Sequence, residues 1–257
     1  MLTIIISTWE DGIFNLERTV RLRHPLVSYL IIHQTQKEPV APDYLINRPD
    51  VDIVSSYTRG LSVSRNIGLR NCKTRYALIA DDDVEYIPAG IEELLKTIEQ
   101  SKPNFGLFKI QTLDGEPEYK RYPKESYEIL ELKHWVSSIE ILIDIDKIRE
   151  YNVCFDERFG LGAPLDRGEE EVFVHDLISH GLRGVYYPLY IVKHPYMSSG
   201  KKSRAVGEHW FVRGALDKRM GKQLSLREIR EELPLKDDMP IAEIYYDKGR
   251  AWVGQSD

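Results

Sequence analysis

The chain has 257 residues, 42% of them hydrophobic and 30% charged, a balance that excludes collagen-like, fibrous and largely disordered proteins. Its net charge of −6 argues against nonspecific binding to nucleic acid phosphates, so no nucleic acid partner is expected. Cys72 and Cys154 have no CxxC or Cys/His metal spacing, and so few thiols fit a reducing compartment better than a disulfide scaffold.

The N-terminus, residues 1–6, has neither the basic region nor the cleavage site of a signal peptide. No apolar run elsewhere approaches the roughly 20 residues that a transmembrane helix needs. We therefore expect a cytoplasmic protein, and peripheral contact with the inner face of a membrane stays open.

Short apolar runs alternate with helical patterns through the first half of the chain. Such alternation predicts a parallel sheet with helices on both faces, and thus an α/β fold. The predicted strands are 3–7, 27–32, 51–54 and 76–80, and the predicted helices are 13–20, 61–69 and 91–98.

The pattern changes after residue 103 to shorter strands and loops, which indicates antiparallel strands added to the parallel sheet. The predicted strands are 105–110, 119–122, 135–143 and 184–192, and the predicted helices are 145–149 and 169–180.

A segment richer in Lys and Arg, including Lys201 and Lys202, begins near residue 201 and predicts one or two helices and a loose tail. We expect a main domain at 1–200 and a helical extension at 201–257 that packs on or near it, through Trp210, Phe211 and Trp252. The basic residues also fit contact with an anionic membrane, although a solvated helical face explains them equally.

Three consecutive acids, Asp81, Asp82 and Asp83, follow the predicted strand 76–80 directly. They are expected at the carboxyl end of a buried strand, where open α/β sheets bind ligands. Carboxylates there suit Mg²⁺ or Mn²⁺ together with substrate phosphates. A solvated acidic loop is the plain alternative.

Several motifs in this order resemble those of the family 2 glycosyltransferases. The segment 59–68, RGLSVSRNIG, is similar to the family's G-x-x-x-x-R-N-x-G helix start, and ADDD at 80–83 is similar to its DxD strand end. FDERFG at 155–160 and GEEEVF at 168–173 resemble the later FDE-x-F-G and G-E-D segments. The resemblance covers about residues 1–200 and implies a GT-A fold, a Rossmann-like mixed sheet flanked by helices.

The resemblance implies an inverting, metal-dependent hexosyltransferase that moves a sugar from a nucleotide-diphosphate sugar to an acceptor hydroxyl. A UDP-sugar is the favoured donor. A glycan or lipid-linked glycan in polysaccharide or glycolipid synthesis is the expected acceptor. Two alternatives stay open, a sugar-phosphate nucleotidyltransferase and a noncatalytic nucleotide- or sugar-binding homologue. The first would carry a glycine-rich, basic signature after the first strand, which residues 7–14 lack.

The resemblance also implies roles for particular residues. Asp83 is the expected ligand of the divalent metal, Asp81 shares the metal or binds the ribose, and His194 completes the coordination. For His194 a structural hydrogen bond at a strand end is equally plausible. The expected donor-binding residues are Ser7, Thr8, Trp9, Arg59, Arg65, Asp81 and Asp82. The nucleobase is left open, because His33 and Gln34 stand after the second strand where members often place an Asp.

The general base corresponds to Glu170, since Gly168 and Glu169 match the first two residues of the family's segment. Glu replaces Asp at this position, so Glu169 or Glu171 can also serve, and acids at a helix start complement the helix dipole in any case. Trp135 and Ser138 are expected beneath the sugar and acceptor, although a single strand aromatic is more often a core residue.

Overall fold

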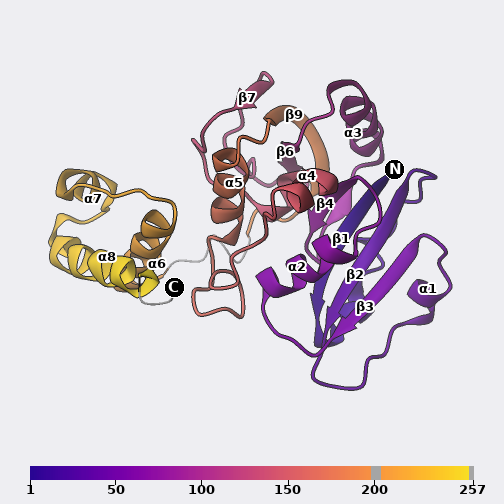
Figure 1. The fold of residues 1–257 in the computed structure, drawn as a ribbon, viewed down its shortest axis with the longest axis horizontal. Coiled ribbons are helices and arrows are strands. Elements are labelled where there is room, and N and C mark those ends of the chain that lie inside the picture. Colours follow the sequence, from indigo (N-terminus) through magenta and orange to yellow (C-terminus); the bar gives the residue numbers. More distant parts are fainter. Residues whose placement is uncertain (198–203, 255–257) are drawn as a thin grey trace. The chain divides into compact units, whose positions relative to one another are not determined.

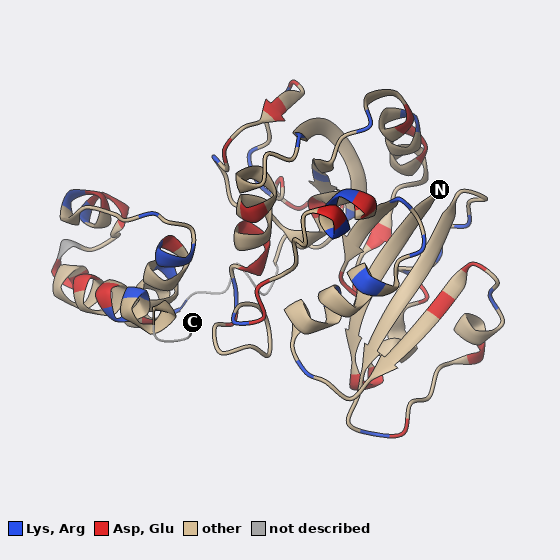
Figure 2. Cartoon of the chain, in the orientation of Figure 1, with Lys and Arg blue, Asp and Glu red and all other residues tan. Residues whose placement is uncertain are grey.

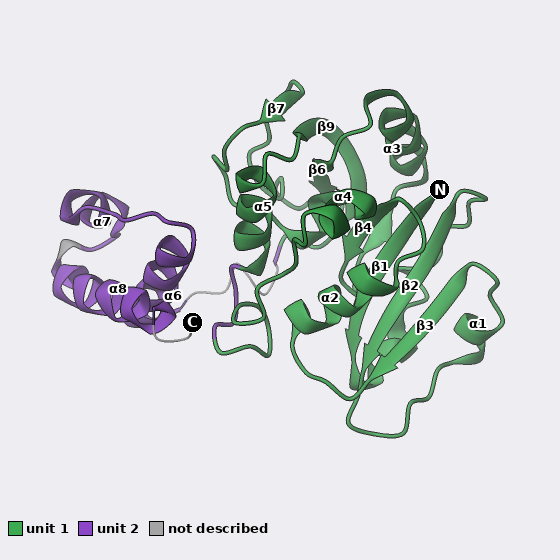
Figure 3. Ribbon diagram, viewed as in Figure 1, with its two compact units in different colours: residues 1–164, 169–196 green, residues 165–168, 197–257 purple. Residues whose placement is uncertain are grey.

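The structure is a computed structural model that describes residues 1–197 and 204–254. The chain forms two compact units, residues 1–164 with 169–196 and residues 165–168 with 197–257 (Figure 3). The expected boundary at residue 200, and Lys201 and Lys202 with it, lie outside the described residues.

The first unit is built on a single mixed sheet (Figure 1). In the described residues its order is β3-β2-β1-β4-β8-β6-β9-β5, and β7 pairs with β9. The strands are β1 Leu2–Trp9, β2 Val27–Gln34, β3 Val51–Ser56, β4 Tyr76–Ala80, β5 Glu85–Tyr86, β6 Phe105–Gln111, β7 Tyr127–Ile129, β8 Ile141–Asp144 and β9 Gly184–Lys193.

The first half of the sheet is parallel, and the second half adds antiparallel pairs, as the sequence predicts. β1 pairs in parallel with both β2 and β4, and β8 runs antiparallel between β4 and β6. Side chains of β1 alternate between two buried clusters, with Ile4 and Ile6 in one and Ile5 in the other. Both faces of the sheet are therefore covered, which explains why this strand is apolar throughout.

Helices supply the cover on each face. α3 contributes Ile91, Leu94 and Ile98 to one cluster, and α5 contributes Phe173 and Leu177 to the other. The α-helices of this unit are α1 Asp43–Ile46, α2 Leu61–Asn71, α3 Pro88–Ser101, α4 Ile145–Glu150 and α5 Glu169–Ser179. The 3-10 helices are η1 Glu10–Asn15 and η2 Ser138–Glu140.

α2 approaches the sheet closely because it carries a glycine at the contact. A Cβ on Gly68 would come 2.3 Å from Cγ2 of Ile5 in β1. Any side chain here would force the helix away from the strand. Gly68 is the glycine of the R-N-x-G motif. The close packing that it allows therefore fixes the position of the Arg and Asn of the same motif.

Three predicted elements are wrong. Residues 13–20 do not form one helix, because a 3-10 helix ends at Asn15 and turns follow. Residues 119–122 lie in a loop, and the short strand of this region is β7. Residues 135–140 are not strand either: the side chain of Ser137 and that of Glu140 form a reciprocal capping box that starts η2, and β8 begins only at Ile141.

Within its described residues the second unit has three α-helices rather than one or two: α6 Val206–Arg219, α7 Leu226–Glu232 and α8 Met239–Val253, with the 3-10 helix η4 Lys236–Asp238. Its core holds Trp210, Ile229, Leu233, Ala242 and Tyr246. α6 and α8 touch at glycines, since a Cβ on Gly214 would lie 2.0 Å from the carbonyl oxygen of Tyr246. Phe211 and Trp252 contact each other across the same pair of helices.

No helix within the described ranges combines the length and the apolar character needed to span a membrane.

Candidate active site

The acidic run directly follows the carboxyl end of β4, which pairs in parallel with β1. Figure 2 colours the acidic and basic residues over the fold. Thr8, near the end of β1, donates a hydrogen bond from Oγ1 to Oδ2 of Asp82 at 2.7 Å. Gly12 makes room for this bond, because a Cβ there would lie 2.5 Å from the Thr8 hydroxyl and 2.9 Å from the Asp82 carboxylate. Burial raises the pKa of Asp82, against the lowering effect of the Thr8 hydrogen bond. Thr8 and Asp82 therefore hold the edge together.

Arg65 of α2 joins the acidic edge to the start of α5. Its side chain is 1% exposed, and Nη2 lies 3.1 Å from Oδ1 of Asp81 while Nη1 lies 2.9 Å from Oε1 of Glu169. Nη1 is also 3.8 Å from Oε1 of Glu170, and the guanidinium lies over the ring of Phe155. A planar guanidinium can bridge two carboxylates in this way, whereas an ammonium group cannot present two donors in a fixed fork.

Glu169 and Glu170 differ in whether their carboxylates are accessible and bound to Arg65. Glu169 is buried and bound to Arg65, and its Oε2 has no hydrogen-bond partner among the described residues. The Glu170 side chain is 19% exposed. Burial, together with the neighbouring charge of Glu169, raises the pKa of Glu170 well above its usual value, although Arg65 opposes this. Of these two acids, Glu170 is the one with both access and a high proton affinity.

The R-N-x-G helix and the F-D-E-x-F-G loop are joined by hydrogen bonds. The Asn66 amide donates to the carbonyl of Phe155 at 2.9 Å and to Glu157 at 3.0 Å, and it accepts from the backbone N–H of Phe155 at 2.8 Å. Ser62 donates to the carbonyl of Phe159 at 2.6 Å. Two segments about 90 residues apart in sequence therefore act as one support for Arg65 and α5.

Asp83 and His194 meet at the open side of the edge. Asp83 is 66% exposed and His194 is 8% exposed, and Oδ1 of Asp83 lies 3.5 Å from Nε2 of His194. Nδ1 of His194 is 2.7 Å from the carbonyl oxygen of Pro195, so Nδ1 carries a proton, because a carbonyl only accepts. The hydrogen bond from His194 lowers the pKa of Asp83, and Asp83 raises the pKa of the buried His194 although burial of the imidazole opposes this.

The remaining predicted donor residues divide into buried and exposed ones. The Ser7 hydroxyl is buried and accepts a hydrogen bond from Ser64 at 2.9 Å. Trp9 is 40% exposed, and the guanidinium of Arg59 lies 5.7 Å from the centre of its ring. Trp9 and Arg59 are therefore available to a ligand, and Ser7 supports α2.

The two predicted substrate residues also differ. Ser138 is 1% exposed and donates to Oδ2 of Asp81 at 3.4 Å. Trp135 is 43% exposed, which excludes the core role for it. Its ring lies 5.8 Å from that of Tyr119, which lies 5.8 Å from the ring of His194. A row of rings thus leads from the acidic edge to Trp135.

Residues 38–151 match the family model described as glycosyl transferase family 2, and they include the helix with Arg65 and the acidic edge. This segment belongs to glycosyl transferase family 2. The resemblance seen in the sequence is thereby confirmed, and the acids of α5 and His194 lie beyond the matched segment. No curated protein matches the sequence significantly.

Solved structures similar to this chain include S. aureus TarS 1–349 in complex with UDP-GlcNAc, with a TM-score of 0.64, 12% identity and coverage of 99% of this chain and 74% of that one. The complex of TarS 1–349 with UDP gives a TM-score of 0.63 at 12% identity, covering 97% and 72%. Another TarS structure gives 0.62 at 13% identity, and this chain covers 44% of it. At such identities the likeness shows the fold, which is GT-A-like as expected.

Sequence reasoning missed Glu140 and its partners. Glu140 is 1% exposed, and its carboxylate accepts from the Tyr122 hydroxyl and the Lys120 ammonium, both at 2.5 Å, and from the backbone N–H of Ser137 at 2.9 Å. The S-x-x-E spacing of Ser137 and Glu140 is a capping-box signal that was available in the sequence. The two partners in the 119–122 loop had no local signal.

Proposed function

We propose that this chain is an inverting glycosyltransferase that moves a sugar from a nucleotide-diphosphate sugar to an acceptor hydroxyl. The observation that carries the proposal is the bridge made by Arg65 between Asp81 at the strand end and Glu169 at the start of α5. The bridge brings the groups suited to the leaving nucleotide next to a carboxylate suited to the acceptor. UDP-GlcNAc, the ligand named for TarS, makes a UDP-sugar the first donor to test.

Glu170 is the general base of the proposal. It takes the proton of the acceptor hydroxyl as the acceptor oxygen attacks from the face opposite the leaving group. A base works best when its pKa lies near the working pH, and the surroundings of Glu170 shift its pKa in that direction. Glu169 is held by Arg65 and serves to position it.

Asp83 and His194 fit a divalent cation. Within the described residues no group of three or more His, Cys, Asp and Glu side chains is arranged to hold an ion alone. Nδ1 of His194 is bonded to the carbonyl of Pro195, so Nε2 is the atom that faces Asp83, and a divalent cation would take the place of the proton that Nε2 shares with this carboxylate. Mg²⁺ and Mn²⁺ commonly share their ligands between such side chains and substrate phosphates, where they neutralise the charge of the leaving diphosphate.

The other residues bind or support the donor. Trp9 and Arg59, which are exposed and in contact with each other, provide a flat, positively charged surface for the nucleobase and phosphates. Arg65 and Ser138 hold the 36% exposed carboxylate of Asp81 in place, which supports its proposed role at the ribose or the cation. Arg65 therefore acts as a positioning residue rather than a direct ligand of the donor.

The test is a thermal-shift panel of UDP, GDP, ADP and CMP with and without Mn²⁺, followed by hydrolysis of the matching nucleotide sugars. A ligand that binds the folded state raises the melting temperature by mass action. We expect a Mn²⁺-dependent shift with UDP and slow release of UDP from a UDP-sugar. Absence of any shift, or a shift without hydrolysis of any nucleotide sugar, would contradict the proposal and favour a noncatalytic binding module.

A glycan or lipid-linked glycan is the proposed acceptor, and a hexosyl group is the proposed transferred unit. Both follow from the family resemblance and from the exposed Trp135, whose flat ring suits the C–H face of a sugar.

A further inference from the structure

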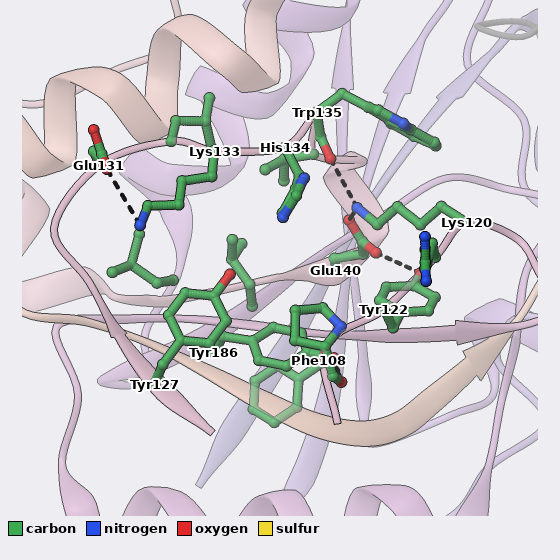
Figure 4. A pocket seen from close by; sticks show the side chains of 16 residues that line it. Phe108, Lys120, Tyr122, Tyr127, Glu131, Lys133, His134, Trp135, Glu140 and Tyr186 are labelled. Carbon is green, nitrogen blue, oxygen red and sulfur yellow. Dashed lines mark hydrogen bonds and ion pairs between the residues drawn. The ribbon is translucent and has the colours of Figure 1, made fainter. Parts of the chain in front are cut away.

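We propose that the hollow beside Trp135 binds an anionic substituent, phosphate or carboxylate, on the acceptor sugar. The inference rests on the proposed function and deepens it by naming the chemical class of the acceptor. The hollow lies under the loop that joins β6 to η2 and against Tyr186 of β9 (Figure 4).

The hollow is held open by a buried charge network. Glu140 accepts hydrogen bonds from Lys120 and Tyr122, and Lys120 donates in addition to the carbonyl of Trp135 at 2.8 Å. A buried carboxylate with every partner in place fixes its neighbours firmly, since each broken bond would leave a charge unsatisfied. Lys120 and Trp135 are thus held together, and the ammonium lies 4.6 Å from the centre of the Trp135 ring.

Aromatic side chains make up much of the walls. Tyr127 and Tyr186 stack with ring centres 5.1 Å apart, and Phe108 and Tyr122 also line the hollow. Trp135 lines it too and is 43% exposed. Carbohydrate sites combine such flat apolar surfaces with a few fixed polar groups.

The charges around the hollow leave one cation unmatched. Glu140 is neutralised by Lys120 and Glu131 by Lys133 at 3.3 Å. Arg121 and His134 also line the hollow, and neither makes a hydrogen bond or ion pair with another residue in the part of the chain that the structure describes. Figure 4 shows the His134 ring between the two ion pairs. The guanidinium of Arg121 is always charged and presents a fork of donors that matches phosphate or carboxylate.

The size of the hollow limits what enters it. Its volume is about 30 Å³, far below the several hundred Å³ of a pocket that encloses a whole ligand. It has room for a small polar group. A sugar ring would therefore stay outside on Trp135 and place only its charged substituent inside.

The hollow is connected to the acidic edge. η2 carries Ser138, which donates to Asp81, and two residues later Glu140, which supports the hollow. From the other side the ring row His194, Tyr119 and Trp135 leads to the same place. A molecule held at Trp135 thus lies beside the site of transfer, which is where an acceptor belongs.

The experiment measures binding of glucose 6-phosphate, glucuronate, glucose and inorganic phosphate to the full chain by isothermal titration calorimetry at constant ionic strength. The two acids distinguish phosphate from carboxylate as the substituent. We expect the charged sugars to bind more tightly than glucose and inorganic phosphate. In Arg121→Ala their affinity should fall roughly tenfold, as the loss of one charged hydrogen bond predicts, with glucose unchanged.

Lys124→Ala is the matched control, because Lys124 is an exposed cation three residues further along the same loop and does not line the hollow. Trp135→Ala should weaken all three sugars. The proposal would be overturned if glucose and glucose 6-phosphate bound equally, or if the Arg121 and Lys124 variants had equal effects. It would also be overturned if inorganic phosphate bound as tightly as glucose 6-phosphate, or if no sugar bound at all.

Metal-dependent binding of UDP and hydrolysis of the UDP-sugar are measured in the same variants and should be unchanged in Arg121→Ala. If the donor reactions persist while the sugar results are negative, only the acceptor inference fails. If the donor reactions are absent from the wild-type protein, it is the proposed function that fails.

Discussion

Three carboxylates, those of Asp81, Glu169 and Glu170, surround the guanidinium of Arg65. Their combined charge exceeds the single positive charge of Arg65. Asp81 and Glu169 have the hydrogen bonds to Arg65, whereas burial and the charge of Glu169 raise the pKa of Glu170. Removing one partner of such a buried pair typically costs about 3–5 kcal/mol.

Replacement of Glu170 by Gln should separate catalysis from stability. Turnover should fall by at least about 100-fold, because the acceptor proton loses its base, while UDP binding in thermal shift stays the same. The raised pKa means that ionised Glu170 destabilises the folded state as the pH rises from the unfolded pKa through the folded one. Glu170→Gln should therefore melt at a higher temperature than the wild type at pH 8, and the difference should shrink toward pH 4.

A variant that keeps near-normal turnover would show that another group is the base. A melting difference that grows as the pH falls would show that Glu170 is not destabilised by burial.

Replacement of Asp83 by Ala should remove the contribution of the cation to donor binding. A ligand at 100 times its Kd stabilises the folded state by about 2.7 kcal/mol, and the part of this stabilisation that requires Mn²⁺ should disappear. Asp114→Ala, which changes an exposed acid in the turn after β6, is the control. An unchanged Mn²⁺-dependent shift with UDP in Asp83→Ala would contradict the metal role.

At the scale of elements, the site depends on α2 more than on any loop. α2 lies against β1 at Gly68, bonds the 155–160 loop through Asn66, and presents Arg65 between two acidic segments. α2 therefore positions both halves of the site, the acidic edge after β4 and the start of α5. A shift of this helix would displace both.

Asn66→Ala should destabilise the first unit by about 1–3 kcal/mol, because the backbone N–H and carbonyl of Phe155 lose their partner in a buried place. Asn71→Ala is the matched control on the same helix, since Asn71 makes an exposed bond to the carbonyl of Ile67. Urea unfolding of both variants measures the difference. Equal losses of stability would show that the loop does not depend on Asn66.

At the scale of the molecule, the chain divides into two compact units, each with its own buried core. In the second unit Tyr246 joins the core to a buried acid, since its hydroxyl donates to Asp217 at 3.0 Å. Gly214 and Gly249 allow α6 and α8 to pack backbone to backbone.

Trp210→Ala should destabilise this second unit by about 3–5 kcal/mol, the usual cost of removing a buried Trp. If each unit unfolds in its own thermal transition, calorimetry should show a lower midpoint for the second unit. The transition of the first unit, identified by its rise with UDP, should keep its midpoint. If both transitions move together, the two units unfold as one.

The basic residues of the second unit bear on the expected membrane contact. Many of them are paired, as Arg204 is with Asp166 and Arg213 with Asp217 and Glu232. We predict weak, salt-sensitive flotation of the full chain with acidic liposomes, since unpaired cations contribute about 1 kcal/mol each near an anionic surface. Equal flotation of a chain that ends at Gly200 would exclude the second unit as the contact.

Much of the fold could be predicted because its signals are local. The continuous apolar runs of β1, β2 and β4 predicted strands buried on both faces, and the acids after β4 predicted a ligand edge. The strands predicted at 119–122 and 135–140 were wrong because the conformation of both segments depends on Glu140, whose buried partners lie as far as 20 residues away.

The candidate site divides in the same way. The sequence by itself determined the family motifs, the order of the elements and which acids to consider. Only the tertiary structure decided that Glu169 is bound to Arg65 while Glu170 keeps partial access to solvent. It also decided that Ser7, Thr8 and Ser138 support the site while Trp9, Arg59 and Trp135 are exposed. The physical reason is that contacts across the fold set the burial and the partners of a side chain, as in the hydrogen bond between Arg65 and Glu169, which are 104 positions apart. Local periodicity reports only on near neighbours in the sequence.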